Sequence, residues 1–265
     1  MNFKAIDFSK FSSIRIGPTI EVALIENDIV PPNHTIVGSA NNLLVSPTPP
    51  PLMILSKAYD FIRIEGNRLI IGAATPGGRI VSFCKKNNIA HFEYLSKLPG
   101  TLGGMVKMNA GLKEYEIFNH LIALRTKSGW IPKEEIEYGY RKTSIEDVIF
   151  EVAFEREEGF SLERLEMFAQ MRSNQPHEPS AGSCFKNPPG DYAGRLIEAV
   201  GLKGVRQGAM AFSEVHANFL VNYAKGTFED AICLINEAKR RVFAEFNIEL
   251  QCEVVILESN NMTKK

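Results

Sequence analysis

The sequence predicts an α+β fold, in which helices alternate with antiparallel or mixed sheets. Two apolar runs at 61–65 and 68–72 flank Gly66-Asn67, a dipeptide typical of two-residue β-hairpins. Thr227 precedes apolar residues at helical spacing, which predict the longest helix, and Asn247 ends it. Both kinds of regular structure are therefore expected in one chain.

The remaining elements follow in order along the chain. Strands are expected at 35–37, 121–126, 148–154, 218–222 and 249–257, and helices at 75–88, 162–171 and 192–200. Lys127–Gly129 turns the second of these strands back. Ser161 caps the second helix and Gly201 ends the third. In the last strand Glu253 interrupts apolar residues, so it is either an edge-strand charge facing water or a carboxyl that is paired or used chemically.

The composition is that of an ordinary globular protein. The chain has 265 residues, 45% hydrophobic and 23% charged, with a formal net charge of -1. We expect roughly one to three domains, no general attraction to nucleic acid or membranes, and a cytoplasmic monomer without a signal peptide. The four cysteines are scattered and the five histidines form no His-x-x-x-His pair, which predicts a reducing compartment and no metal site.

Two stretches rich in small residues are candidate ligand-binding loops. Gly38–Leu43 follows a short β-branched run, and its backbone N–H groups can hold phosphate oxygens. The glycines of Leu98–Gly104 and Met108–Gly111 form an unusual loop that allows close approach to a flat or anionic ligand. Neither stretch matches a Rossmann fingerprint or a P-loop. A pair of tight structural turns explains the second stretch equally well.

A third stretch, Pro179–Asn187, carries Ser183 next to Gly182, with Lys186 before its last residue. A hydroxyl on such a turn, near a cation and an amide, can meet an anionic ligand. A Pro- and Gly-rich surface turn with a capping serine is the alternative, and the local chemistry alone favours it.

Seven blocks in this order make the chain resemble the UDP-N-acetylenolpyruvoylglucosamine reductases, the flavoenzymes of bacterial peptidoglycan precursor synthesis. The blocks are Pro99–Gly104, Met108–Gly111, Tyr140-Arg141, Pro179–Pro188, Ala193–Ile197, His216–Phe219 and Glu253-Val254. The resemblance runs from about Ile14 to Ile256. It implies NADPH-dependent, FAD-dependent reduction of UDP-N-acetylglucosamine enolpyruvate to UDP-N-acetylmuramate.

The resemblance also implies a fold. Two α+β subdomains of the vanillyl-alcohol-oxidase type would hold FAD, and a C-terminal α+β domain would bind the substrate. The implied boundaries are 1–55 with 248–265 for the first FAD-binding subdomain, 56–156 for the second and 157–247 for the substrate-binding domain. The short spacing between Arg141 and Ser183 leaves little room for the tyrosine loop of longer relatives, so we place the chain in the shorter branch.

The family's catalytic residues fall on Ser183, Arg141 and Glu253. The resemblance implies that Ser183 donates a proton, Arg141 stabilises the substrate carboxylate and protonated Glu253 hydrogen-bonds it. Positions that would contact FAD are Gly38, Ser39, Ala40, Asn41, Asn42, Leu43, Gly100, Thr101, Gly103, Gly104, Asn109, Ala110 and Gly111. Positions that would contact the substrate are Tyr140, Arg172, Gln175, Lys186 and Asn187. Arg195 either binds phosphate or forms a surface ion pair.

The first loop departs from the family pattern Gly-x-Gly-Ser-Asn, because Ala40 and Asn41 replace Gly and Ser. Alanine favours negative φ, so we expect a less secure phosphate contact at Ala40. Two alternatives remain open: another flavin oxidase or dehydrogenase of the same superfold, and a nucleotide-binding protein that has lost its flavin.

Overall fold

A computed structural model describes residues 1–259, which fall into two compact units. Unit 1 is Met1–Lys4, Ala23–Ser39 and Met53–Ser173, and unit 2 is Ala5–Val22, Ala40–Leu52 and the described residues from Asn174 onward. Residues 260–265, which the predicted first subdomain includes, lie outside the described part. The predicted division into three domains stays a prediction.

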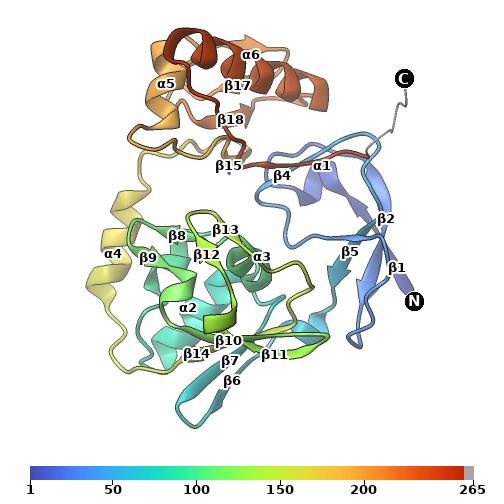
Figure 1. Cartoon of the computed structure of the whole chain (residues 1–265), viewed down its shortest axis with the longest axis vertical. Helices are drawn as coiled ribbons and strands as arrows, with labels where there is room; N and C mark the ends of the chain where they lie inside the picture. Colours follow the sequence, from blue (N-terminus) through green and yellow to red (C-terminus); the bar gives the residue numbers. More distant parts are fainter. Residues whose placement is uncertain (260–265) are drawn as a thin grey trace. The chain divides into compact units, whose positions relative to one another are not determined.

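Unit 1 is built on a five-stranded antiparallel sheet with the order β11-β10-β14-β7-β6 (Figure 1). Its strands are β6 (Ile62–Glu65), β7 (Arg68–Gly72), β10 (Leu121–Thr126), β11 (Gly129–Pro132) and β14 (Glu151–Glu155). The predicted hairpin at Gly66-Asn67 is confirmed, since Glu65 pairs with Arg68 across it. The predicted turn before Gly129 is confirmed in the same way by its pairing with Thr126.

Three helices complete unit 1: α2 (Gly77–Lys86), α3 (Leu102–Lys107) and α4 (Leu162–Met171). Ile80 of α2 and Val106 of α3 are fully buried in one hydrophobic cluster with Leu69 and Ile71 of β7. The predicted cap of α4 is confirmed, because the Ser161 hydroxyl accepts a hydrogen bond from the N–H of Arg164.

Helix α3 corrects the expectation that the glycine-rich stretch is entirely loop. Its first two N–H groups find acceptors outside the helix: Leu102 donates to the carbonyl of Thr75 at 2.9 Å and Gly103 to that of Ala73 at 2.8 Å. These bonds satisfy donors that a helix start otherwise leaves unpaired. Along α4, Phe168 is 1% exposed and contributes to the core, whereas Leu162 at the first position is 56% exposed.

Shorter strands form small pairs and a second sheet. The pairs in unit 1 are β8 (Gly111–Leu112) with β9 (Tyr115–Glu116), and β12 (Tyr138–Gly139) with β13 (Lys142–Thr143). The second sheet has the order β1-β2-β5-β3, formed by Asn2–Asp7, Thr19–Ile25, Leu52–Leu55 and Thr35–Ile36. Strands β2 and β5 are parallel. The sheet that contains the expected strands 121–126 and 148–154 is antiparallel, which is one of the two arrangements expected for it.

Unit 2 contains an antiparallel sheet with the order β15-β18-β17-β16. The helices and strands that lie wholly within unit 2 are α1 (Phe8–Phe11), β4 (Leu43–Val45), β15 (Ser180–Ser183), α5 (Ala193–Ala199), β16 (Arg206–Gln207), β17 (Met210–Phe212), β18 (Phe219–Asn222), α6 (Phe228–Phe246) and β19 (Val255–Leu257). Leu234 and Val242 of α6 are buried in one cluster with Phe212 and Leu220 of the sheet.

Helix α6 has the boundaries that the sequence predicts. The Thr227 hydroxyl accepts from the N–H of Asp230, and the Asp230 carboxylate accepts from the N–H of Thr227, which makes a capping box. Asn247 ends the helix in the left-handed conformation, with φ 54°. Local signals therefore define this helix at both ends.

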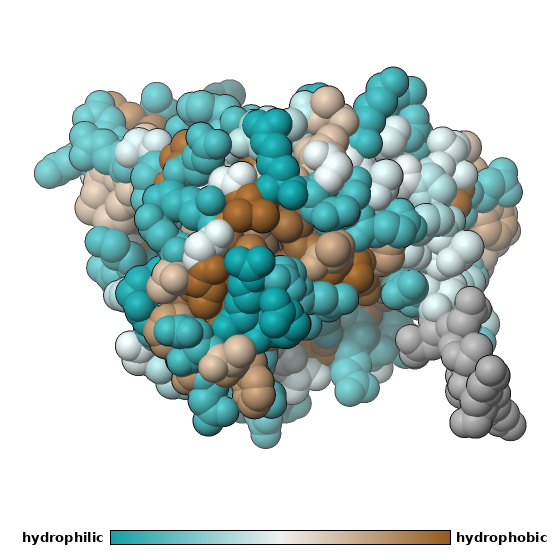
Figure 2. Space-filling view, turned by 90° about the horizontal axis from the view of Figure 1, so that it is seen from above, coloured by the Kyte–Doolittle hydropathy of each residue, from teal (hydrophilic) through white to brown (hydrophobic). Residues whose placement is uncertain are grey.

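The described surface is mixed in polarity. Figure 2 shows one face of the molecule, on which hydrophilic residues surround smaller hydrophobic areas. Within residues 1–259, none of the helices combines the length and apolar character needed to cross a bilayer.

Candidate active site

Ser183 lies at the end of the edge strand β15 in unit 2, opposite Phe219 of β18. The pairing register shifts between Ser180 and Ser183, and Gly182 adopts a φ of 78° within this irregular segment. The surface-turn alternative does not hold for Ser180–Ser183, because this part of the segment pairs with β18 as a strand. A residue with a side chain would be strained at the φ of Gly182, so the glycine permits the distortion that precedes Ser183.

Asn218 holds the segment that follows Ser183. Its side chain accepts a hydrogen bond from the N–H of Phe185 at 3.0 Å and donates to the carbonyl of Phe185 at 2.8 Å. Its backbone carbonyl accepts from the N–H of Cys184 at 2.7 Å. Asn218 is only 3% exposed, so these bonds satisfy groups that water does not reach. The amide thus positions the serine segment.

His216 in turn supports Asn218. Its Nδ1 accepts a hydrogen bond from the N–H of Asn218 at 3.2 Å. Burial lowers the pKa of His216, which favours the neutral ring that such an acceptor requires. The block His216–Phe219, quoted for the resemblance, therefore has a structural basis that the sequence analysis did not give it.

Glu253 is carried by a backbone segment next to that of Ser183. The N–H of Glu253 donates to the carbonyl of Cys184 at 2.9 Å, and the N–H of Lys186 donates to the carbonyl of Gln251 at 2.8 Å. The predicted strand 249–257 is correct only at its end, because regular pairing is confined to β19. Glu253 lies before that strand, half-buried, so the edge-strand alternative does not apply.

Cys184 follows Ser183 directly and its carbonyl accepts the N–H of Glu253, but its thiol is unreactive. Its side chain is 2% exposed, and burial raises the pKa of the Cys184 thiol well above its usual range. Because the thiolate is the reactive form of cysteine, Cys184 does not compete with Ser183 as a reactive group.

Asn42, in the candidate loop Gly38–Leu43, contacts the segment of unit 2 that carries Glu253. The Asn42 side chain donates to the carbonyl of Glu253 at 2.9 Å, and the carbonyl of Asn42 accepts from the N–H of Val255 at 2.9 Å. Leu43 then pairs with Val255 in the parallel pair β4–β19. Unit 2 therefore brings together Asn42, Glu253 and Ser183 from three distant parts of the sequence.

Ala40 adopts a φ of 53° and is 3% exposed. The expectation that alanine here avoids positive φ is wrong. The loop is held by Ser13, whose N–H donates to the carbonyl of Ala40 at 3.2 Å and whose hydroxyl donates to that of Asn41 at 3.3 Å. These bonds keep the conformation that a glycine would adopt more easily.

In unit 1, the residues before Ala40 lie against the second glycine-rich stretch. A Cβ atom at Gly38 would stand 2.7 Å from Oγ1 of Thr101, and one at Gly100 would stand 3.9 Å from Oγ of Ser39. Gly103 packs on Ala73, which leaves 3.1 Å between an added Cβ and that methyl group. Two separate predicted cofactor loops thus meet within unit 1.

Arg141 occupies the turn between β12 and β13, with a φ of 56°. Its guanidinium donates to the carbonyl of Gly111 at 3.2 Å and, more weakly, to that of Asn109 at 3.5 Å. The guanidinium carbon lies 5.1 Å from the centre of the Tyr140 ring, within the range of a cation–π contact. These contacts fix the direction of a side chain that is otherwise long and mobile.

Asn109, whose carbonyl accepts the weaker hydrogen bond from Arg141, is completely buried. Its side chain donates to the Glu116 carboxylate at 2.8 Å and to the carbonyl of Gly139 at 3.2 Å. Its Oδ1 accepts from the N–H of Phe118 at 3.4 Å. The family resemblance implies a cofactor contact for Asn109, and nothing in the sequence indicated that Asn109 also holds the segments around Arg141.

The remaining predicted residues are spread over both units. Arg172 is the C-cap of α4 in unit 1, and Gln175 is the second residue of the last part of unit 2, which begins at Asn174. Asn187 caps the start of α5, since its Oδ1 accepts from the N–H of Ala193 at 3.1 Å. Arg195 forms a surface ion pair with Asp191. Of the three predicted catalytic residues, Ser183 and Glu253 belong to unit 2 and Arg141 to unit 1.

Comparison with known proteins gives consistent results. A family model described as the C-terminal domain of UDP-N-acetylenolpyruvoylglucosamine reductase matches residues 175–257. The UDP-N-acetylenolpyruvoylglucosamine reductase of Helicobacter hepaticus is 49% identical over 263 residues, covering 97% of this chain and 100% of that protein. That of Campylobacter jejuni strain RM1221 is 47% identical and covers 95% and 99%. The crystal structure of UDP-N-acetylenolpyruvylglucosamine reductase (MurB) from Thermus caldophilus is similar with a TM-score of 0.86 and 28% identity, covering 97% and 100%.

Proposed function

The chain belongs to the UDP-N-acetylenolpyruvoylglucosamine reductases, oxidoreductases of cell-wall precursor synthesis, and from this membership we propose how its residues serve the reaction. The substrate is UDP-N-acetylglucosamine enolpyruvate, and the product is UDP-N-acetylmuramate. Similarity over 97% of the chain favours this reductase over both alternatives of the sequence analysis. The observation that carries the proposal is that Ser183 and Glu253 lie on adjacent, hydrogen-bonded segments of unit 2.

FAD and NADPH are the proposed cofactor and hydride donor, and when bound the flavin supplies the hydride chemistry. The glycines of unit 1 fit a flat or anionic group. A Cβ atom added at Gly104, which is exposed, would have Oγ1 of Thr101 as its nearest neighbour at 4.0 Å. A Cβ atom at Gly100 would contact the Met105 side chain at 3.6 Å, so the accessible backbone beside the Thr101 hydroxyl is that of Gly104. The vanillyl-alcohol-oxidase type of fold, with the domain boundaries given above, is part of the same proposal.

Ser183 is the proposed proton donor. Reduction of the enolpyruvyl double bond requires a proton on the carbon that does not receive the hydride, and Oγ of Ser183 would deliver it. A positioned general acid contributes typically about 10²–10⁴-fold. Because serine is a weak acid, it needs a fixed position, which Asn218 provides by holding Cys184 and Phe185.

Arg141 and Glu253 are the proposed partners of the substrate carboxylate. Arg141 is always cationic and stabilises negative charge that develops on the carboxylate during hydride addition. Its anchors at Gly111 and Asn109 hold the guanidinium in place before the reaction. Glu253, in its protonated form, would donate a hydrogen bond to the same carboxylate, and Asn42 holds its backbone.

The remaining assignments follow from family membership. Contacts with the substrate are proposed for Tyr140, Arg172, Gln175, Lys186 and Asn187. The ion pair with Asp191 favours a structural role for Arg195 over phosphate binding. A cytoplasmic location and a monomeric state belong to the same proposal.

An anaerobic absorbance experiment on the purified protein tests the reaction in two steps. We expect a flavin spectrum that bleaches on addition of NADPH and returns on addition of UDP-N-acetylglucosamine enolpyruvate. A spectrum that bleaches but does not return would reject the substrate and keep the flavoprotein. A colourless protein that FAD does not reconstitute would reject the cofactor assignment.

A further inference from the structure

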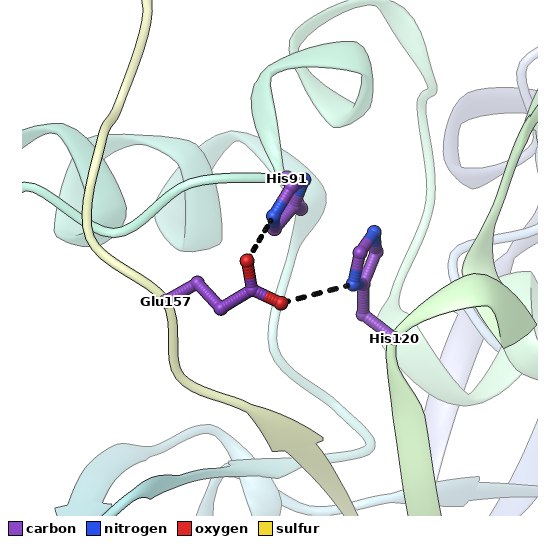
Figure 3. Close-up of side chains that lie close together, drawn as sticks. All are labelled: His91, His120 and Glu157. Atoms are coloured by element: carbon purple, nitrogen blue, oxygen red, sulfur yellow. Dashed lines mark hydrogen bonds and ion pairs between the residues drawn. The ribbon is translucent and has the colours of Figure 1, made fainter.

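Unit 1 brings together three metal-ligating side chains that the candidate active site does not use. His91 follows α2, His120 immediately precedes β10, and Glu157 follows β14. Figure 3 shows the two imidazole rings side by side, with the Glu157 carboxylate facing both. One nitrogen or oxygen atom from each of the three residues lies within 4.8 Å of the others.

The separations among these atoms are close to those in a metal site. Nε2 of His91 is 3.0 Å from Oε2 of Glu157, and Nδ1 of His120 is 3.8 Å from Oε1. Around a tetrahedral zinc ion with bonds of about 2.0–2.2 Å, donor atoms lie roughly 3.4 Å apart. The two observed distances bracket this value. Because an imidazole nitrogen binds a metal in the plane of its ring and the two rings are stacked, one ring has to turn out of the stack before all three residues can reach one ion.

The histidines are held in a specific arrangement. Their ring centroids are 3.8 Å apart and their planes differ by 13°. His91 also has a φ of 73°, in the left-handed region that residues other than glycine seldom adopt. Backbone conformations of this kind persist where the surrounding structure imposes them, often at ligand sites.

A small hollow beside the rings offers room for a further ligand. It has a volume of about 10 Å³ and is lined by both histidines together with Glu93, Glu116, Arg164 and other residues, but not by Glu157. That volume holds about one water molecule. The two carboxylates are already engaged: Glu93 accepts from the N–H of Ser161, and Glu116 accepts from Asn109. A water is therefore the ligand that this hollow suits.

We propose that His91, His120 and Glu157 bind one divalent transition-metal ion, and that zinc is the ion that fits best. Two imidazoles and one carboxylate, with a water in the fourth position, form a donor set that zinc accepts readily. Magnesium and calcium prefer sites built from oxygen alone. The ion would connect three segments of unit 1 that are far apart in the sequence and would stabilise that unit, since it binds the folded form.

Zinc titration of the full-length protein tests this site. We expect one equivalent of Zn²⁺ to bind in calorimetry and to raise the melting temperature, and Mg²⁺ to do neither. Co²⁺ in the same site should give the visible absorption of a tetrahedral complex. His91→Gln and His120→Gln should each weaken zinc binding by at least about tenfold, which is the lower limit for loss of a group that merely supports a metal ligand. In the double variant, zinc should not raise the melting temperature.

Matched variants keep the result specific. His34→Gln removes a histidine elsewhere in unit 1, and Cys233→Ser removes an exposed thiol; both should bind zinc as the wild type does. Glu157 is 51% exposed in its side chain, so Glu157→Gln should fold normally and lose the cobalt spectrum. Equal zinc affinity in the wild type and the double histidine variant would overturn the proposal, as would a wild-type protein that binds no zinc.

Discussion

At the scale of single residues, Ala40 shows how hydrogen bonds can impose an unfavourable backbone conformation. Its φ of 53° costs about 1–2 kcal/mol for a residue with a Cβ. This preference led to the expectation of a less secure phosphate contact at Ala40. Two hydrogen bonds from Ser13 hold the loop. The loop therefore keeps the left-handed conformation although alanine stands where the family pattern has glycine, and the strain remains at Ala40.

Substitution by glycine should reveal that strain. Ala40→Gly loses a buried methyl group worth about 0.8 kcal/mol and makes the unfolded state more flexible. It also relieves the strain of the left-handed conformation. The free energy of unfolding should therefore stay within about 1 kcal/mol of the wild-type value. Ala153 of β14 is equally buried at 3% exposure, without positive φ, and Ala153→Gly should cost about 1.5 kcal/mol. Equal losses in urea unfolding would contradict this account.

Asn218 is the second residue whose role depends on contacts beyond its neighbours in sequence. Asn218→Ala leaves the buried N–H and C=O of Phe185 without their partner, which should cost about 3 kcal/mol. Because the Ser183 segment then loses its support, kcat should fall about tenfold or more. Thermal unfolding and steady-state kinetics measure the two effects.

Asn222 provides the matched control for Asn218. It is also buried, at 4% exposure, and its side chain also makes two hydrogen bonds, to the carbonyl of Ile14 and the N–H of Gly226. Asn222→Ala should therefore lower stability by a similar amount but change kcat much less. Similar kcat losses in both variants would mean that general destabilisation, and not the position of Ser183, explains the effect.

At the scale of elements, the sequence predicted the segments that local signals define. Gly66-Asn67 identified the β6–β7 hairpin, and Thr227 and Asn247 identified both ends of α6. The errors fall on α3, β15 and β19. Pairing with distant segments defines these three: α3 starts on the carbonyls of Ala73 and Thr75, and β15 pairs with β18. The amino-acid composition of a segment does not indicate which distant segment it will pair with.

A charged network connects several elements of unit 1. Arg125 of β10 donates to Asp28 at 2.5 Å and to Glu151 of β14 at 2.8 Å. The Tyr59 hydroxyl donates to Asp28 at 2.6 Å. Burial, and then the bond to Asp28, raise the pKa of Tyr59 from 10.0 to about 12. Folding thus keeps this phenol protonated at pH values where the unfolded chain would ionise it.

The stability of the protein should therefore depend on Tyr59 at alkaline pH. A raised pKa contributes stability that is complete below pH 10 and is lost as the pH rises toward about 12. The difference in free energy of unfolding between wild type and Tyr59→Phe should shrink across this range. Tyr192 is 70% exposed, and Tyr192→Phe serves as the control, with a constant difference from wild type. A constant difference for Tyr59→Phe would contradict the assignment.

At the scale of the whole molecule, the candidate site depends on contacts that cross long stretches of sequence. The order of the seven blocks identified Ser183, Arg141 and Glu253, but it did not show what holds them. Asn109 and Gly111 anchor Arg141, and Asn42 and Cys184 hold the backbone of Glu253. These bonds join residues that are thirty or more positions apart, where no periodic pattern reports them.

The His91–His120–Glu157 cluster illustrates the same limit. Metal motifs in sequence rely on ligands a few positions apart, and the spacing of the histidines therefore predicted no metal site. The fold of unit 1 brings the two rings to 3.8 Å regardless of that spacing. Only the three-dimensional arrangement makes zinc binding a testable property of the chain.

Rapid-reaction measurement of Ser183→Ala tests the central claim most directly, because it separates the two half-reactions. The account predicts that NADPH bleaches the flavin of this variant nearly as fast as in the wild type. Reoxidation by UDP-N-acetylglucosamine enolpyruvate should slow by at least about a hundredfold, since the proton donor is missing. Equal slowing of both half-reactions, or unchanged reoxidation, would contradict the role assigned to Ser183.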